Sequence, residues 1–135
     1  MYQQMIFVNL PVRDLAASKT FFTELGYAIN AQFSDDSTAS VVISDTIVAM
    51  LHTPEKYGIF TKKEIADATR TSEVLIALSA ESREKVDELV GKALAAGGTA
   101  TGETQDHGFM YGRAFDDLDG HTWEIVWMDP AAVQG

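Results

Sequence analysis

The stretch DDLDGHTWEIVW, residues 116–127, decides the fold of this chain. Asp119 and Gly120 form a turn signal, and the apolar run that follows is typical of a buried β-strand. Glu124 lies in the middle of that run. An unpaired carboxylate in such a place costs several kcal/mol. The stretch therefore predicts a partner for Glu124, which is a metal ion, a ligand or a neighbouring side chain.

Length and composition indicate one globular domain. The chain has 135 residues, of which 46% are hydrophobic, and it has no cysteine, which excludes disulfides and thiolate metal sites. Its net charge of −10 disfavours nucleic acid and anionic membrane surfaces as partners. Neither a signal-peptide pattern nor an apolar run of about 20 residues is present, so we expect a cytoplasmic protein with no membrane partner.

The hydrophobic pattern predicts the same order of elements in both halves of the chain. Asp14 and Ser82 are expected to cap two amphipathic helices, which end at Gly26 and Gly97. The expected strands are residues 5–10, 28–33, 39–44 and 46–51 in the first half, and 72–79, 99–104, 110–116 and 121–127 in the second.

The two halves also match each other in sequence. FVNL at 7–10 corresponds to LIAL at 75–78, and TIVAMLHTP at 46–54 corresponds to TWEIVWMDP at 122–130, with an offset of about 70 residues. We therefore predict one domain, residues 1–135, of α+β class with two βαβββ modules. The modules cover about 1–54 and 72–130, and a linker of about 55–71 carries one or two helical turns.

Three stretches resemble the vicinal-oxygen-chelate superfamily, which includes glyoxalase I, bleomycin and fosfomycin resistance proteins and extradiol dioxygenases. They are VNLPVRDLAASKTFFTELGY (8–27), REKVDELVGKALAAGGT (83–99) and FDDLDGHTWEIVW (115–127). The last is the most specific, because the closing strand of the family typically has the pattern Asp-x-x-Gly-x-x-x-Glu. Within the superfamily the chain most resembles a group of bacterial proteins usually labelled predicted lactoylglutathione lyases or extradiol-dioxygenase-like. The resemblance implies a mixed sheet that curls around a cleft, and a homodimer.

The resemblance also implies where a metal site would lie. Metal enzymes of the superfamily use His or Glu on the first and fourth strands of each module. The corresponding positions are Phe7, Val48, Leu75 and Glu124. Because a single carboxylate does not hold a catalytic metal, we expect no metal and no other cofactor. A shift of one or two residues in the strand register would instead bring in Glu73, Asn9 or His52.

The hairpin of the last two strands suggests a different partner for Glu124. If Asp116 lies opposite His121, then Arg113 lies opposite Glu124 on the cleft face, and the two can form an ion pair. Such a pair either stitches the hairpin or presents Arg113 to an anionic or carbonyl group. The residues expected to bind a ligand in the cleft are Arg113, Glu124, Tyr111, Asn9, His52 and Asp106.

We therefore expect a glyoxalase/bleomycin-resistance-like protein that binds a small molecule in its cleft without the standard metal site. Two alternatives stay open, a metal-dependent lyase or isomerase of lactoylglutathione lyase type and an extradiol-type dioxygenase. Metal-free catalysis with Tyr111 or His52 as the acid or base also stays open. The sequence identifies no catalytic residue and no substrate.

Overall fold

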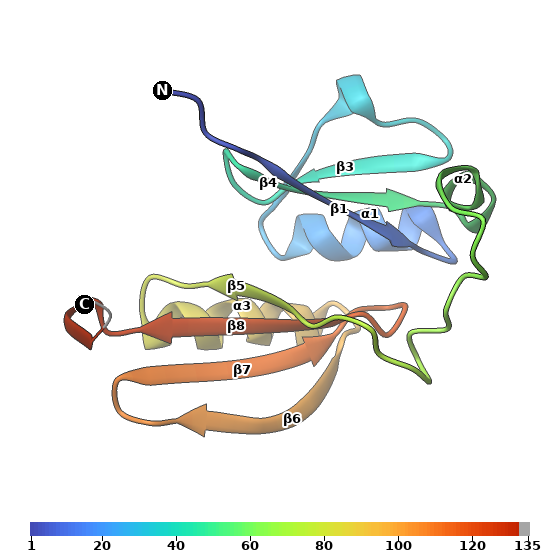
Figure 1. The fold of residues 1–135 in the computed structure, drawn as a ribbon. Coiled ribbons are helices and arrows are strands. Elements are labelled where there is room, and N and C mark those ends of the chain that lie inside the picture. The colour runs from blue at the N-terminus through green and yellow to red at the C-terminus, as the bar shows by residue number, and fades with distance from the viewer. Residues whose placement is uncertain (133–135) are drawn as a thin grey trace. The chain divides into compact units, whose positions relative to one another are not determined.

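The structure, a computed structural model, describes residues 1–132, and the chain divides into two compact units, Met1–Ala66 and Asp67–Gly135 (Figure 1). Each unit contains a strand, a helix and three further strands in that order, which confirms the predicted pair of βαβββ modules and the α+β class. No helix within residues 1–132 has the length and apolar character needed to cross a membrane.

Unit 1 contains one four-stranded mixed sheet. Its elements are β1 (Ile6–Pro11), α1 (Leu15–Glu24), β2 (Ala28–Ile29), η1 (Ala31–Phe33), β3 (Thr38–Val42), β4 (Ile47–His52) and α2 (Pro54–Phe60). The strand order is β1-β4-β3-β2, with β1 parallel to β4 and the other neighbours antiparallel. Strand β1 is therefore an edge strand.

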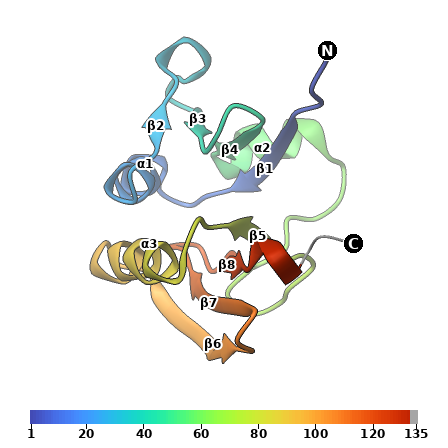
Figure 2. The same ribbon diagram turned by 90° about the vertical axis from the view of Figure 1, so that its left-hand side faces the viewer.

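Helix α1 covers one face of this sheet. Its cap is the one expected, because the side chain of Asp14 accepts a hydrogen bond from the backbone N–H of Ala17. Phe21 and Phe22 are buried on its inner side, and the core continues into the sheet through Val41. Figure 2 views the helix end-on beside its strands. Burial of this face fixes which way each strand residue points.

One segment of unit 1 differs from the expectation and another agrees with it. The strand predicted over 28–33 ends at Ile29, because the side chain of Asn30 accepts a hydrogen bond from the N–H of Gln32 and starts a 3₁₀ turn. The helical turns predicted in the linker are confirmed as α2, which Thr53 caps. Helix α2 lies at the end of the sheet where β4 finishes (Figure 1).

Unit 2 repeats the arrangement. Its elements are β5 (Ile76–Ser79), α3 (Arg83–Ala95), β6 (Thr99–Asp106), β7 (Met110–Asp116), β8 (Thr122–Met128) and η2 (Pro130–Ala132). The strand order is β5-β8-β7-β6, with β5 parallel to β8. The first strand begins at Ile76 rather than at residue 72 as predicted, and Leu75 before it is 59% exposed.

Helix α3 covers one face of the second sheet. Ser82 caps it, since its hydroxyl accepts a hydrogen bond from the N–H of Lys85. Val86 and Val90 are buried on its inner side, and Trp123 and Ile125 of β8 are buried on the facing side of the sheet. Trp123 and Ile125 of β8 thus lie on the side of the sheet that faces α3.

The turn between β7 and β8 is built around the side chain of Asp117. The Oδ1 of Asp117 accepts hydrogen bonds from the N–H groups of Asp119 and His121, and its Oδ2 accepts one from the indole of Trp123. The backbone N–H of Asp117 also donates to the carbonyl of His121, which closes the turn between these two residues. Burial raises the pKa of the Asp117 carboxyl.

This turn shifts the hairpin by one residue from the predicted register. Asp116 pairs with Thr122 and not with His121. When the pairing of two strands shifts by one residue, every side chain of one strand moves to the opposite face of the sheet relative to the side chains of the other strand. The prediction therefore failed at the turn, where Asp117 supplies the side chain that fixes the loop length.

Candidate functional site

Arg113 and Glu124 do not form the predicted pair. Arg113 pairs with Ile125, and Glu124 pairs with Ala114, so the two side chains lie on opposite faces of the sheet. The Nη1 of Arg113 lies 3.0 Å from the Oδ1 of Asp87 on α3. The physical reason is the closing of the turn at Asp117, which places Arg113 on the helix side.

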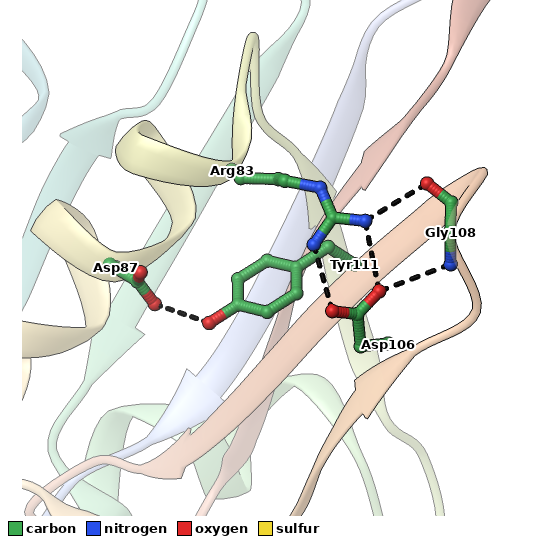
Figure 3. A network of polar contacts seen from close by, with 5 residues as sticks. All are labelled: Arg83, Asp87, Asp106, Gly108 and Tyr111. Atoms are coloured by element: carbon green, nitrogen blue, oxygen red, sulfur yellow. Dashed lines mark hydrogen bonds and ion pairs between the residues drawn. The ribbon is translucent and has the colours of Figure 1, made fainter.

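Tyr111, like Arg113, lies on the side of the sheet that faces α3. The prediction that it points into the cleft is therefore also wrong. Its hydroxyl donates a hydrogen bond of 2.7 Å to Asp87, as Figure 3 shows. Hydrogen bonds from Tyr111 and Arg113 lower the pKa of the Asp87 carboxyl. The three groups join β7 to α3.

Asp106 belongs to the same side of unit 2. Both of its oxygens accept hydrogen bonds of 2.9 Å from the guanidinium of Arg83, which also donates to the carbonyl of Gly108 (Figure 3). The guanidinium carbon of Arg83 lies 5.1 Å from the ring centre of Tyr111 and 5.2 Å from that of Trp127. The Arg83 pair lowers the pKa of Asp106 to about 2. The guanidinium of Arg83 thus balances the charge of Asp106, and no ligand is needed to explain it.

Glu124 faces away from α3, between Thr122 and Val126 on its strand. It is half-buried, and its carboxylate makes no hydrogen bond or ion pair with residues 1–132. In the same part of the chain, no group of three or more His, Asp or Glu side chains has the geometry of a metal site. Partial exposure lets water solvate the carboxylate, which reduces the cost of its position.

Unit 1 brings the other two predicted residues together. We call the face of its sheet opposite α1 the second face, and its side chains are Phe7, Asn9 and Pro11 of β1, Val48, Met50 and His52 of β4, and Thr38, Ser40 and Val42 of β3. In the register, Asn9 lies beside Met50, and Thr38 lies beside His52. Asn9 and His52 were predicted to point the same way, and they do.

The side chain of His52, on β4, forms hydrogen bonds with side chains of both neighbouring strands, β1 and β3. Its Nε2 lies 2.8 Å from the Oδ1 of Asn9, and its Nδ1 lies 2.9 Å from the Oγ1 of Thr38. Because Oδ1 is an acceptor, Nε2 carries the proton, and the hydroxyl of Thr38 donates to Nδ1. A neutral imidazole with its proton on Nε2 satisfies all of these groups.

The surroundings of His52 favour this neutral form. The residue is 2% exposed, and rings from α2 lie against it, with centroid distances of 6.4 Å to Tyr57 and 5.1 Å to Phe60. Burial lowers the pKa of His52, and the charge of Lys56 lowers it further, while Asp35 opposes them. His52 is therefore a buried neutral hydrogen-bonding group.

A hydroxyl, an imidazole and an amide in this order also occur where a histidine activates a nucleophile. Thr38 is poorly placed for that chemistry. It is 6% exposed, and both its backbone N–H and that of Ser37 donate to the carboxylate of Asp35, so they are not available to an oxyanion. The arrangement instead orients Asn9.

Asn9 and Phe7 form the exposed part of the second face. Asn9 is exposed on the edge strand β1, and Phe7, two residues earlier on the same face, is 54% exposed. Met50 beside Asn9 is half-buried. This combination of an oriented amide and an apolar surface is a candidate ligand-binding site.

Sequence reasoning missed Thr38, Arg83 and Asp87. Thr38 follows a polar turn and lies one residue before the strand predicted over 39–44. Arg83 and Asp87 lie four residues apart on one helix face, a spacing that also describes ordinary exposed charges. The strands predicted over 39–44 and 46–51 form a hairpin. Lengthening the first strand to begin at Thr38 and the second to end at His52 would have placed these two residues side by side.

Comparisons with known proteins agree with the fold. A family model described as bleomycin resistance protein-like N-terminal matches residues 4–44. The solved structure of hypothetical protein SA1046 from S. aureus is 31% identical, with 94% of each chain covered and a TM-score of 0.77. No curated protein sequence matches the chain.

Two further solved structures carry the family name. A glyoxalase/bleomycin resistance protein/dioxygenase family enzyme from Burkholderia phytofirmans PsJN is 18% identical over 93% of this chain and 99% of its own, with a TM-score of 0.78. A glyoxylase/bleomycin resistance protein/dioxygenase domain from Frankia sp. EAN1pec is 26% identical over 95% and 99%, with a TM-score of 0.66. The chain therefore has the fold of the glyoxalase/bleomycin resistance protein/dioxygenase structures, and its residues 4–44 match the bleomycin resistance protein-like N-terminal family model.

Proposed function

We propose that the protein binds a small molecule on the second face of unit 1, at Asn9 and Phe7. The observation that carries the proposal is an exposed amide, oriented by a buried histidine, beside an exposed aromatic ring. Small-molecule sites are mostly apolar, with a few polar groups held in fixed positions. The match of residues 4–44 to a bleomycin resistance protein-like family model supports a binding role.

The side chains favour binding of a ligand without a metal ion over metal-dependent catalysis. Glu124 is the single ionisable side chain among the four positions that the family resemblance marks as ligands, and Phe7 occupies another. Phe7 cannot donate an electron pair to a metal, but its ring can pack against a ligand. Metal-dependent lyase and dioxygenase activities remain the alternatives to be tested.

A ligand screen by thermal unfolding tests the proposal. Three proteins are compared, namely the wild type, Asn9→Leu and the control Gln105→Leu, which changes an exposed amide on β6. A ligand present at 100 times its Kd adds about 2.7 kcal/mol of stability. We expect compounds that stabilise the wild type and the control but not Asn9→Leu. Compounds that stabilise all three proteins equally contradict the proposed site.

The same preparation tests the alternatives. Elemental analysis of the purified protein is followed by assays with methylglyoxal and glutathione, with nickel or zinc added, and with a catechol and ferrous iron. Turnover that depends on Glu124, measured with Glu124→Gln, would replace the binding proposal with an enzymatic one. We expect no metal-dependent turnover.

We also propose a homodimer that covers the free edges of the two sheets. Strands β1 and β5 are both edge strands, and exposed apolar residues at or just before their beginnings include Ile6, Val74 and Leu75. Exposed apolar edges favour pairing with another chain. Light scattering at micromolar concentration should give twice the mass of 14.7 kDa, and Leu75→Lys should reduce it. A wild-type monomer contradicts the proposal.

A further inference from the structure

We infer that His52 is a positioning residue, which holds Asn9 so that its Nδ2 donates a hydrogen bond to a carbonyl oxygen of the ligand. The inference rests on the proposed binding of a small molecule at the second face, and it names the chemical class of that molecule. Its basis is the orientation of one amide group and the hydrogen atoms that this orientation leaves available.

Two contacts fix the orientation of the Asn9 amide. Its Oδ1 accepts from the Nε2 of His52 at 2.8 Å, and its Nδ2 donates to the carbonyl of Phe7 at 3.3 Å. If the amide were reversed, Oδ1 would face the carbonyl oxygen of Phe7, and two acceptors would repel each other. The amide therefore has one stable orientation, with Nδ2 away from His52.

This orientation leaves a donor without a partner. Nδ2 carries two hydrogen atoms, and the contact with Phe7 uses one of them. The second has no acceptor within residues 1–132. Because Asn9 is exposed, a ligand can approach this N–H group from solvent.

Thr38 and the burial of His52 keep the donor in place. The Thr38 hydroxyl donates to Nδ1, so the proton of the neutral ring stays on Nε2, where Asn9 needs it. The other tautomer would leave an acceptor, Nε2, facing the acceptor Oδ1. The titratable and charged groups that face His52 are Lys56 and Tyr57 of α2 and Asp35 of the turn before β3.

The neighbours of the free donor define the ligand class. Phe7, on the same face of β1, offers an exposed ring, and Met50 offers a thioether beside Asn9. A flat apolar molecule with a carbonyl oxygen matches both the ring and the N–H group. An apolar molecule without an acceptor oxygen would use the ring alone.

The test uses ¹⁵N-labelled protein at pH 8 with two matched probes, acetophenone and ethylbenzene. The Asn9 side-chain amide and the His52 ring nitrogens are followed by NMR. We expect acetophenone to move the Asn9 amide resonances and to bind about three- to tenfold more tightly than ethylbenzene, the effect of one hydrogen bond. The ring nitrogens should show the proton on Nε2.

Variants separate positioning from folding. Asn9→Asp keeps an acceptor for His52 but removes the donor, and it should lose the preference for acetophenone. His52→Leu should lose the preference as well, whereas His52→Gln, whose amide N–H can replace Nε2–H, should retain it. Amide spectra confirm that each variant is folded, and if His52→Leu does not fold, Asn9→Asp alone decides the result.

The outcomes also separate this inference from the proposed function. If both probes bind at the second face with equal affinity, or if Asn9→Asp keeps the preference, the role of Asn9 as a carbonyl donor is overturned and binding at this face stands. If neither probe moves any resonance of β1 or β4 at millimolar concentration, while other ligands bind there, the carbonyl class is wrong. If no compound of the thermal screen binds there, the proposed function itself fails.

Discussion

Arg113 and Asp87 form an ion pair that joins β7 to α3, with 3.0 Å between Nη1 and Oδ1. Asp87 is largely exposed, so the pair should contribute about 1 kcal/mol or less to the free energy of unfolding. A double-mutant cycle with Arg113→Met and Asp87→Asn measures this coupling. The Asn side chain keeps an acceptor for the hydroxyl of Tyr111.

The control for this cycle is Glu124→Gln combined with Arg113→Met. We expect no coupling there, because Arg113 and Glu124 lie on opposite faces of the sheet. A larger coupling of Arg113 with Glu124 than with Asp87 would mean that the register of β7 and β8 is wrong.

The stability of unit 1 should depend on pH through His52. Burial lowers the pKa of His52 below its ordinary value of 6.5, so between that value and the lowered pKa the unfolded chain binds a proton that the folded protein does not. Stability is therefore fully present above 6.5 and is lost as the pH falls through the pKa of the folded protein. Urea unfolding at several pH values should show this decrease.

His52→Gln supplies the comparison, since it cannot take up the proton. The variant should show a smaller decrease of stability in that pH window than the wild type does. Equal pH dependence in the two proteins would show that His52 does not titrate differently in the folded and unfolded states.

Gly120 should tolerate alanine less well than Gly108 does. Both have positive φ angles, +88° and +82°, which cost an alanine about 1–2 kcal/mol. At Gly120 a Cβ would also lie 2.8 Å from the backbone nitrogen of Thr69, whereas at Gly108 no atom of residues 1–132 would lie within 4 Å of it. Chemical unfolding should therefore give a clearly larger loss for Gly120→Ala.

Equal losses for the two alanine variants would contradict the close packing of residues 68–69 against the turn at Gly120. Gly108→Ala serves as the control for backbone strain alone, because it has the same left-handed conformation without the steric contact.

The sequence predicted the elements whose signals are local. The caps at Asp14 and Ser82 and the strand after the Asp119-Gly120 turn follow from short-range patterns, and all three are confirmed. The hydrophobic pattern also predicted the order of the helix and the strands along the chain in both units. These predictions succeeded because burial of one face of each element dictates them.

The register of β7 and β8 could not be obtained in the same way. The turn residues indicate a hairpin, but its length depends on which residues the Asp117 side chain binds, and that requires three-dimensional contacts. One residue of error moved Tyr111 and Arg113 to the wrong face. Asn9 and His52 were placed correctly, because parallel pairing of β1 and β4 leaves both on the face opposite α1.

Binding of a small molecule at the second face of unit 1 is tested most directly by NMR of methionine methyl groups. The chain has 5 methionines, and Met50 is the one on the second face, beside Asn9. Met110 and Met128 in unit 2 serve as internal references. Ligands from the thermal screen should shift the Met50 methyl resonance, and Asn9→Leu should weaken that shift. Ligands that shift only Met110 or Met128, with Met50 unchanged at saturation, would contradict the proposed site.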